Sequence, residues 1–303
     1  MPELPDLSLY VDHLERRVVG RALVDVRLAS MFLLRTVEPP LAEVIGRDVK
    51  RISRLGKQLV FSFDAQEQTH ELRNELHMVI HLMISGRLRW KEQGASIRGR
   101  NVVAGFDFQD GTLLFTEASK KKRASLRIVD DAGLSKLDLG GLEVLEISCE
   151  EFVVRLRDSG HTLKRALTDQ RVFAGIGNAY SDEILLHAGM SPFKRAGTLS
   201  DQDGETLFEA TRSVLNEWTE RLAARAGDSF PDKVTAFHPE MAVHGKYKEP
   251  CPLCSAPVQR IRYAENEANY CAGCQTGGKL LADRSLSRLL KDNWPKRLED
   301  LEP

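Results

Sequence analysis

The chain has 303 residues, of which 43 are Lys or Arg and 44 are Asp or Glu, so its formal net charge is -1. This length predicts two or three domains, and 42% apolar with 29% charged residues is typical of a folded globular protein. The charge balance excludes a histone-like polycation and a disordered acidic tail. Nucleic-acid binding stays open, because it depends on a basic face and not on the total charge.

The sequence argues against export and membrane insertion. It has no run of about 18 consecutive apolar residues, so we expect no membrane span. The start MPELPDLSLY lacks the basic and apolar regions of a secretory signal. We therefore expect a cytoplasmic protein.

The first half of the chain is predicted to be one helix followed by β-structure. Asp6 is a suitable N-cap, and apolar residues at helical spacing predict a helix over 6–18. From about 21 to 130 the pattern changes to short β-like runs, with a hairpin signal at Asp110-Gly111. Residues 1–135 are therefore predicted to form a β-sandwich or barrel-like domain entered by a helix.

The second half is predicted to be mainly helical. Helical runs begin near residue 148 and are EEFVVRL, TLKRAL, AYSDEILLHAG and DQDGETLFEATRSVLNEWTERLAAR. Residues 227–245 show little periodicity and are predicted to form a loop that closes a helical domain over 148–245. An amphipathic helix is expected at 283–293, within an extension over 278–303.

Four of the five cysteines form the strongest motif. Cys251-x2-Cys254 is followed, after sixteen residues, by Cys271-x2-Cys274. Two such knuckles supply four thiolates for one tetrahedral zinc ion. The intervening sequence alternates as a β-hairpin does, and no open ligand position is evident. Residues 246–277 are therefore predicted to hold one structural Zn2+; uncoordinated thiols are the alternative.

A glycine-rich turn precedes the third predicted helix. The sequence Gly175-Ile176-Gly177-Asn178 leads directly into AYSDEILLHAG. Such turns present backbone N–H groups and the positive end of the helix dipole to an anion. Asn178 lies where its amide can cap the helix or donate to a phosphate. Taken alone, the motif favours an ordinary helix entry over a phosphate site.

The N-terminus Met1-Pro2-Glu3 has a possible chemical role. Removal of Met1 would leave a secondary amine on Pro2, and an α-amino group has a pKa of about 7.7–8.0. A neutral amine can attack a sugar C1′ carbon and form an iminium, with Glu3 as an adjacent acid or base. Without other context, a Pro-rich start is more often a stiff entry to a helix.

Basic residues gather at three places in the β-rich half. The first group borders the start of a predicted strand and consists of Arg51, Arg54 and Lys57. The second lies on one face of a predicted strand and consists of Arg87, Arg89 and Lys91. The third is a run without acids and consists of Lys120, Lys121, Lys122, Arg123 and Arg127. A charge run is usually a solvated face. Three groups in one domain favour a groove that faces phosphates.

Together these features resemble the bacterial formamidopyrimidine-DNA glycosylase / endonuclease VIII family of base-excision repair. The matching segments follow the family order over roughly residues 2–275: PELP at 2–5, RLGKQLV at 54–60, HLMISGRL at 81–88, GIGNAYSDEILLHAGMSP at 175–192, EPCPLC at 249–254 and YCAGCQ at 270–275. The resemblance implies an α+β multidomain fold with an N-terminal β-sandwich, a helix-two-turn-helix domain and a zinc-finger hairpin.

The resemblance also implies a function. The enzyme would remove a damaged base and cleave the abasic site by Schiff-base β- and δ-elimination. Pro2 would be the nucleophile, Glu3 would protonate the sugar ring oxygen, and Lys57 would hold a phosphate. Asn178 and the backbone at Gly175 and Gly177 would bind phosphate, and the damaged base would be flipped out. The partner would be damaged or abasic DNA at the bacterial nucleoid, and one lesion requires only a monomer.

Several positions depart from the family pattern. Asp6 replaces the second Glu of PELPE, and Ile84, preceded by Met83, replaces the Met that fills the space of the flipped base. Either side chain can act as an apolar wedge. EASKKKRAS at 117–125, with Lys120, Lys121 and Lys122, replaces a DPRRFG-like loop in which an Arg reads the opposite base and a Phe wedges beside it, and this segment has no Phe.

The zinc hairpin and the C-terminus also differ. Asn266 stands where the family has a phosphate-binding Arg, and Arg260 or Arg262 on the same hairpin would have to compensate. The chain continues past residue 275, where the family often ends. These departures predict a divergent subgroup whose lesion need not be 8-oxoguanine and whose Lys-rich loop favours backbone contacts or unpaired DNA.

Two other functions compete with this one. A non-catalytic, damage- or structure-specific DNA-binding protein on the same scaffold would explain the altered loop, but it needs no amine at the chain end. A zinc-ribbon interaction module fused to an unrelated β domain explains the cysteines, but neither the N-terminus nor the GIGN segment.

Overall fold

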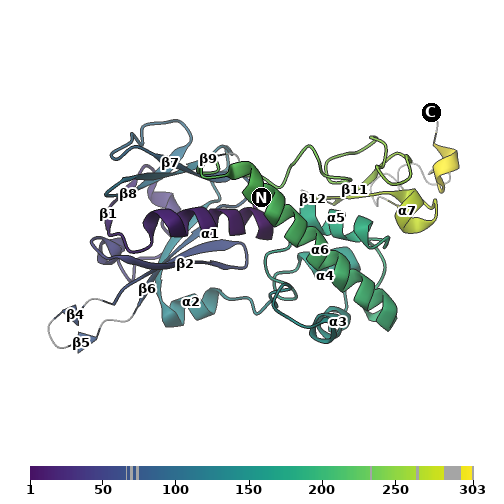
Figure 1. Ribbon diagram of the computed structural model, residues 1–303, viewed down its shortest axis with the longest axis horizontal. Coiled ribbons are helices and arrows are strands. Elements are labelled where there is room, and N and C mark those ends of the chain that lie inside the picture. Colours follow the sequence, from purple (N-terminus) through teal and green to yellow (C-terminus); the bar gives the residue numbers. More distant parts are fainter. Residues whose placement is uncertain are drawn as a thin grey trace. The chain divides into compact units, whose positions relative to one another are not determined.

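The computed structural model describes residues 1–65, 67–68, 71–72, 75–232, 234–263, 266–282 and 295–301 (Figure 1). The chain divides into two compact units. The first comprises residues 1–139 and 218–235, and the second comprises 140–217 and 236–303. None of the helices within the described ranges combines the length and the apolar character that crossing a bilayer requires.

Helix α1 (Leu4–Val18) opens the first unit. Its apolar positions recur at helical spacing, and Leu7, Tyr10 and Leu14 are completely buried. The helix begins two residues before the predicted start, since Pro5 fits the first turn, where no intrahelical N–H bond is needed. The N-cap is therefore Glu3, and the prediction of Asp6 as N-cap is wrong.

Two four-stranded sheets make up the predicted β-sandwich. The order of one is β1 (Leu23–Leu28), β8 (Val102–Phe108), β9 (Gly111–Glu117), β7 (Gly86–Lys91). The order of the other is β10 (Ser125–Asp130), β6 (Leu76–His81), β3 (Gln58–Phe63), β2 (Val49–Leu55). All ladders are antiparallel, and Phe61, Met78, Phe106 and Phe115 are among the side chains that they bury completely.

The hairpin signal in this domain is confirmed. Strands β8 and β9 pair with Phe108 opposite Gly111, which leaves Asp110 in the turn. A small pair, β4 (Glu67–Gln68) and β5 (Glu71–Leu72), lies between β3 and β6. Two 3-10 turns, η1 (Met31–Leu33) and η2 (Leu41–Val44), follow β1.

Helix α2 (Asp131–Leu137) was not expected from the sequence. It has only seven residues and buries none of them, so it has no apolar period to detect. The side chain of Asp130 caps it by accepting from Gly133 N–H at 2.7 Å.

The second unit contains the four predicted helices: α3 (Cys149–Asp158), α4 (Leu163–Thr168), α5 (Asn178–His187) and α6 (Asp201–Ala226), the last of which continues into the first unit. A 3-10 turn, η3 (Ala196–Thr198), precedes α6. Apart from residue 233, which is not described, residues 227–245 contain neither helix nor strand, as the loop prediction requires.

The predicted hairpin between the cysteine pairs is confirmed. It consists of β11 (Gln259–Tyr263) and β12 (Asn266–Tyr270), and the short helix α7 (Ala272–Thr276) follows. A 3-10 turn, η5 (Leu298–Asp300), lies near the C-terminus. The helix expected over 283–293 falls outside the described residues.

Candidate functional site

The chain end is buried at the start of α1. Pro2 is buried, and only 2% of Glu3 is exposed. Burial lowers the pKa of the α-amino group on Met1, and the charges of Arg87 and Lys57 act in the same direction. Glu3 and Asp6 oppose this shift. Four charged side chains therefore act on the amine at the chain end.

A reciprocal cap fixes Glu3 next to the chain end. Its backbone N–H donates to Oδ2 of Asp6 at 2.9 Å, and its carboxylate accepts from the backbone N–H of Asp6. The shorter carboxylate at position 6 is thus long enough to close the capping box. This departure from the PELPE pattern leaves the geometry of the chain end intact.

Tyr10 anchors α1 to β7. Its hydroxyl accepts from Leu88 N–H at 3.1 Å, and it lies 3.5 Å from the Leu88 carbonyl oxygen, to which it donates. Burial raises the pKa of Tyr10, so the phenol remains a neutral donor. Because α1 also packs on β2 and β3, this helix contacts both sheets and fixes the position of Pro2.

Lys57 and His81 lie at one end of the second sheet. Lys57 is buried in the turn before β3, and its neighbour Gln58 pairs with His81 at the end of β6. Burial lowers the pKa of His81 to about 4, and the positive charges of Lys57 and Arg127 act in the same direction. His81 was not among the predicted site residues, although it is the first residue of the matching segment HLMISGRL.

The two expected apolar wedge residues occupy the tight turn after β6. Met83 has a φ of 54°, in the left-handed region, and its N–H donates to Nδ1 of His81 at 3.1 Å. Ile84 is 57% exposed, so an apolar side chain projects from the turn. Gly86 closes the turn, because a Cβ at that position would lie 2.1 Å from the carbonyl oxygen of Leu82.

The Lys-rich loop joins β9 to β10, and a buried carboxylate binds its backbone. The buried carboxylate of Glu117 accepts from Arg123 N–H at 2.9 Å and from Ala124 N–H at 3.2 Å. Lys122 donates to the Glu117 carbonyl oxygen, and it is exposed like its neighbours Lys120, Lys121 and Arg123. The structure thus leaves four consecutive cations of this loop exposed to solvent, on a backbone that Glu117 holds.

The expected strand face with three cations is present on β7. Arg89 and Lys91 are exposed, and Arg87 is half-buried. The Arg87 guanidinium donates to the carbonyl oxygens of Ile84 at 3.1 Å and Gly86 at 2.6 Å. Burial lowers the pKa of Arg87 below its usual value. Arg87 therefore braces the wedge turn as well as contributing charge near the chain end.

In the second unit the GIGN segment forms the entry to α5. Gly175 has a φ of 82°, which favours glycine, and its N–H donates to the side-chain oxygen of Gln170 at 2.9 Å. The amide of Gln170 also donates to the Ile176 carbonyl oxygen at 2.8 Å. Gly177 is the N-cap, and Asn178 is the first helical residue. Gln170, missed by sequence reasoning, fixes the loop.

Two buried acids of α5 hold other segments of this unit. The Glu183 carboxylate accepts from the N–H groups of Ala242, Val243 and His244 at 2.7, 2.9 and 2.9 Å. Asp182 contacts Lys164 Nζ at 2.5 Å and His244 Nδ1 at 2.8 Å. The acids in the SDE segment are therefore structural anchors.

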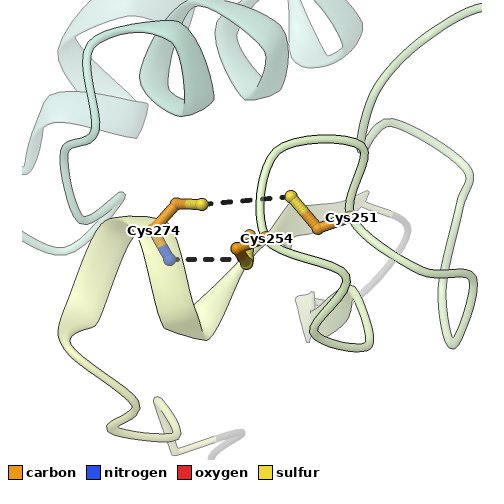
Figure 2. A group of neighbouring side chains, drawn as sticks. Cys251, Cys254 and Cys274 are labelled. Atoms are coloured by element: carbon orange, nitrogen blue, oxygen red, sulfur yellow. Dashed lines mark hydrogen bonds between the residues drawn. The ribbon is translucent and has the colours of Figure 1, made fainter.

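The predicted metal site is assembled from both cysteine pairs (Figure 2). The four Sγ atoms lie within 4.8 Å of one another. Cys251 and Cys274 are 4.0 Å apart at Sγ, and Cys254 and Cys271 are 3.3 Å apart. Thiolates at the corners of a zinc tetrahedron are separated by about 3.8 Å, so the donor set and its spacing fit one structural Zn2+.

Gln275 connects the metal site to the rest of its unit. Its side-chain oxygen accepts from Cys271 N–H at 2.7 Å, and its amide donates to the Met190 carbonyl oxygen at 2.8 Å. On the hairpin, the Arg260 guanidinium lies 4.2 Å from the ring centre of Tyr247, and both Arg260 and Arg262 lie within 4.0 Å of Glu267. This acid offsets part of the positive charge on the hairpin.

Comparison with known proteins identifies the family. Residues 1–124 match the formamidopyrimidine-DNA glycosylase N-terminal domain, and residues 143–226 match the formamidopyrimidine-DNA glycosylase H2TH domain. The chain is 30% identical over 283 residues to formamidopyrimidine-DNA glycosylase of Carboxydothermus hydrogenoformans, covering 91% of this chain and 100% of that one. It is 40% identical over 151 residues to an uncharacterized formamidopyrimidine-DNA glycosylase-like protein of Mycobacterium tuberculosis, covering 50% of this chain and 94% of that protein.

Solved structures agree with these sequence matches. MutM in complex with DNA containing carbocyclic 8-oxo-G has a TM-score of 0.76 and 25% identity, covering 91% of this chain and 100% of that one. The Lactococcus lactis Fpg complex with abasic-site DNA has a TM-score of 0.74 and 25% identity, with coverages of 90% and 99%.

The fold and the metal site define a DNA-repair enzyme with a β-sandwich, an H2TH domain and a structural zinc finger. The chain belongs to the formamidopyrimidine-DNA glycosylase family. It is accordingly a DNA glycosylase and abasic-site lyase of base-excision repair, with DNA as its partner. The competing alternative of a zinc-ribbon module fused to an unrelated domain is excluded, because family matches cover both units.

Proposed function

We propose that Pro2, once Met1 is removed, is the nucleophile of this enzyme. Its nitrogen attacks C1′ of the damaged nucleotide, and the glycosidic bond breaks so that the base departs with the bonding electron pair and a proton. Glu3 protonates the sugar ring oxygen as the ring opens to the iminium. The observation that supports this role is the buried chain end: Glu3 is buried directly after Pro2, and burial there lowers the pKa of the α-amino group on Met1.

The iminium then permits strand cleavage. Loss of a C2′ proton expels the 3′ phosphate by β-elimination, and a second elimination expels the 5′ phosphate. Lys57 binds the phosphate at the lesion, and Asn178, with the backbone at Gly175 and Gly177, binds a further phosphate. None of these steps requires the zinc ion, whose four protein ligands hold the hairpin in place.

We also propose a substrate preference that does not depend strictly on the opposite base. The run of three lysines in this loop supports this, because the ammonium groups of Lys120, Lys121 and Lys122 contact phosphates as point charges and cannot read a base edge as a guanidinium can. Arg123 is the one guanidinium that follows them. Ile84 and Met83 serve as the apolar wedge, and Arg260 and Arg262 provide the remaining positive charge on the hairpin. A glycosylase assay on opposed and unpaired lesions tests the preference; strict dependence on the opposite base would contradict it.

The domain boundaries complete the proposal. Residues 1–135 would form the catalytic β-sandwich, 148–245 the H2TH domain, 246–277 the zinc finger and 278–303 an extension. The DNA of the bacterial nucleoid, in the cytoplasm, would be the substrate of a single copy of the chain.

Borohydride trapping on an abasic duplex tests the nucleophile. We expect a covalent adduct at the Pro2 nitrogen in the wild type and its loss in Pro2→Gly. Glu3→Gln should slow base removal by about 10²- to 10⁴-fold. Glu15→Gln, an exposed acid of the same helix, is the matched control. Absence of an adduct while DNA binding persists would refute the role of Pro2 and favour a non-catalytic DNA-binding protein.

A further inference from the structure

Phe32 is a large apolar side chain that the fold leaves uncovered. In the turn η1 it is 82% exposed and its neighbour Met31 is 72% exposed, whereas Leu33 is 3% exposed and packs into the core. Leu33 alone is thus enough to anchor the turn. An aromatic ring held open to solvent beside a second apolar side chain indicates a contact surface.

The sheet register determines what lies next to this turn. Residues 34–36 run parallel to the start of β10: Leu34 pairs with Leu126, and Arg35 N–H donates to the Leu126 carbonyl oxygen at 2.9 Å. On the opposite side of β10, Ser125 pairs with His81 at the end of β6. Residues 34–36 and β10 run in the same direction, so the residues just before each of them lie at the same end of the sheet. Phe32 comes just before residues 34–36, and the Lys-rich loop comes just before β10.

Three further features share this sheet end. The Lys-rich loop carries the exposed Lys120 and Lys121, and the wedge turn contacts it through Ser119 N–H, which donates to Ser85 Oγ at 3.1 Å. Lys57 precedes β3, which pairs with β6. From β3, which follows Lys57, the order across the sheet is β6, β10 and then residues 34–36, which follow Phe32. Neighbouring strands are about 4.8 Å apart, so these three spacings add up to about 14 Å.

The charges around Phe32 favour one class of ligand. Arg35, Lys120, Lys121 and Arg123 are exposed near it, while the carboxylate of Glu117 is buried against the loop backbone. Glu38 is the exposed acid further along the segment. Cations that follow a phosphate backbone and an aromatic ring that stacks on a base are the two parts of a site for unpaired nucleic acid.

We propose that Phe32 stacks on an unpaired base of the DNA while Lys120 and Lys121 bind the adjoining phosphates. This deepens the proposed preference for unpaired DNA and rests on it. The stacking ring absent from the Lys-rich loop is then supplied by the neighbouring segment. The base comes either from the strand opposite the lesion, left without a partner by flipping, or from an unpaired flank of the lesion strand.

Fluorescence of 2-aminopurine distinguishes these two sources. One substrate is an abasic-analogue duplex with 2-aminopurine opposite the analogue; the other is a bubble with 2-aminopurine next to it on the same strand. Wild-type protein should quench whichever probe stacks on Phe32. Phe32→Ala should lose most of that quenching and bind that substrate about tenfold more weakly. Lys120→Gln/Lys121→Gln should weaken binding with little loss of quenching at saturation.

Two controls make the result specific. Val37→Ala removes an apolar side chain of nearly equal exposure, 83% against 82% for Phe32, from the same segment but away from the Lys-rich loop. Phe237→Ala removes an exposed ring from the other unit. Equal quenching and affinity, within about twofold, for wild type and Phe32→Ala on both substrates would overturn the proposal. A protein partner or a second copy covering Phe32 would give that result.

Failure here is distinguishable from failure of the proposed chemistry. Borohydride trapping of the wild type reports on Pro2, whereas quenching by the wild type reports on stacking. Trapping without quenching would reject stacking by Phe32 and leave the nucleophile in place. Quenching without trapping would reject the nucleophile and leave the stacking site in place.

Discussion

His81 shows how burial determines the chemistry of a single side chain at the sheet end. Its Nδ1 accepts a hydrogen bond from Met83 N–H, which requires that nitrogen to be unprotonated. Its pKa of about 4, against the usual 6.5, keeps the ring neutral at physiological pH. His81 can therefore hold the wedge turn without adding charge beside Lys57.

This shift predicts how stability depends on pH. The folded pKa is the lower one, so between pH 6.5 and 4 the unfolded chain binds more protons, and the stability from neutral His81 is lost as pH falls. We expect a loss of about 2 kcal/mol between pH 7.5 and pH 5 from this group. Urea denaturation at both pH values measures it.

The His81→Asn variant keeps an acceptor for Met83 N–H but does not titrate. Between pH 7.5 and pH 5 its free energy of unfolding should therefore fall by about 2 kcal/mol less than that of the wild type. His187→Asn, an exposed histidine on α5, is the control and should follow the wild type. An identical pH dependence in His81→Asn and wild type would show that His81 is not the group responsible.

At the scale of an element, the wedge turn is fixed by one backbone contact. Gly86 N–H donates to the Leu82 carbonyl oxygen at 2.9 Å, and a Cβ on residue 86 would lie only 2.1 Å from that oxygen. The turn holds Ile84 outward and packs against the Lys-rich loop through Ser85. Position 86 therefore requires glycine because the Leu82 backbone leaves no space for a side chain, and not because its φ is unusual.

Gly86→Ala should therefore destabilise the first unit by about 2–3 kcal/mol and displace Ile84. The added methyl group meets backbone, which cannot rotate away as a side chain can. The midpoint of urea denaturation, compared with that of the wild type, measures the loss. Gly197→Ala is the control, because its Cβ would meet nothing closer than 3.9 Å. A change below about 0.5 kcal/mol would mean that the turn adapts at little cost.

At the scale of the whole molecule, DNA binding must be achieved with a net charge of -1. Cations are therefore segregated: the sheet end of the first unit carries Lys57, Lys120 and Lys121, while acids such as Glu117 and Glu183 are buried in hydrogen bonds to the backbone. Local positive charge, and not the total, should determine affinity for DNA.

Salt dependence of DNA binding tests this distribution. Each phosphate contact contributes about -0.9 to the slope of log K against log salt. Lys57→Gln should make that slope shallower by about 0.9 and weaken binding to damaged duplexes. Fluorescence anisotropy at several salt concentrations measures both quantities. Lys136→Gln, an exposed lysine of α2, should leave the slope unchanged, and an unchanged slope in Lys57→Gln would exclude a phosphate contact.

The elements whose signal is local were predictable from the order of the residues. The periodicity of α1, the Asp110-Gly111 turn, the helices of the second unit and the spacing of the four cysteines each depend on residues that are near one another in the chain. The matching segments, from PELP to YCAGCQ, likewise determined the family, the zinc site and the candidate nucleophile. Helix α2 was not predicted because it has only seven residues, none of them fully buried.

Contacts between residues that are distant in the chain became visible only in the folded protein. Glu3 rather than Asp6 begins α1 because the cap is closed by a reciprocal pair of hydrogen bonds. His81 is neutral because burial, which no sequence pattern reports, removes its charge. Phe32 is near the Lys-rich loop because residues 34–36 and β10 run parallel, although about ninety positions separate them. Burial and strand pairing depend on the folded chain as a whole, and for that reason they lie beyond the sequence pattern.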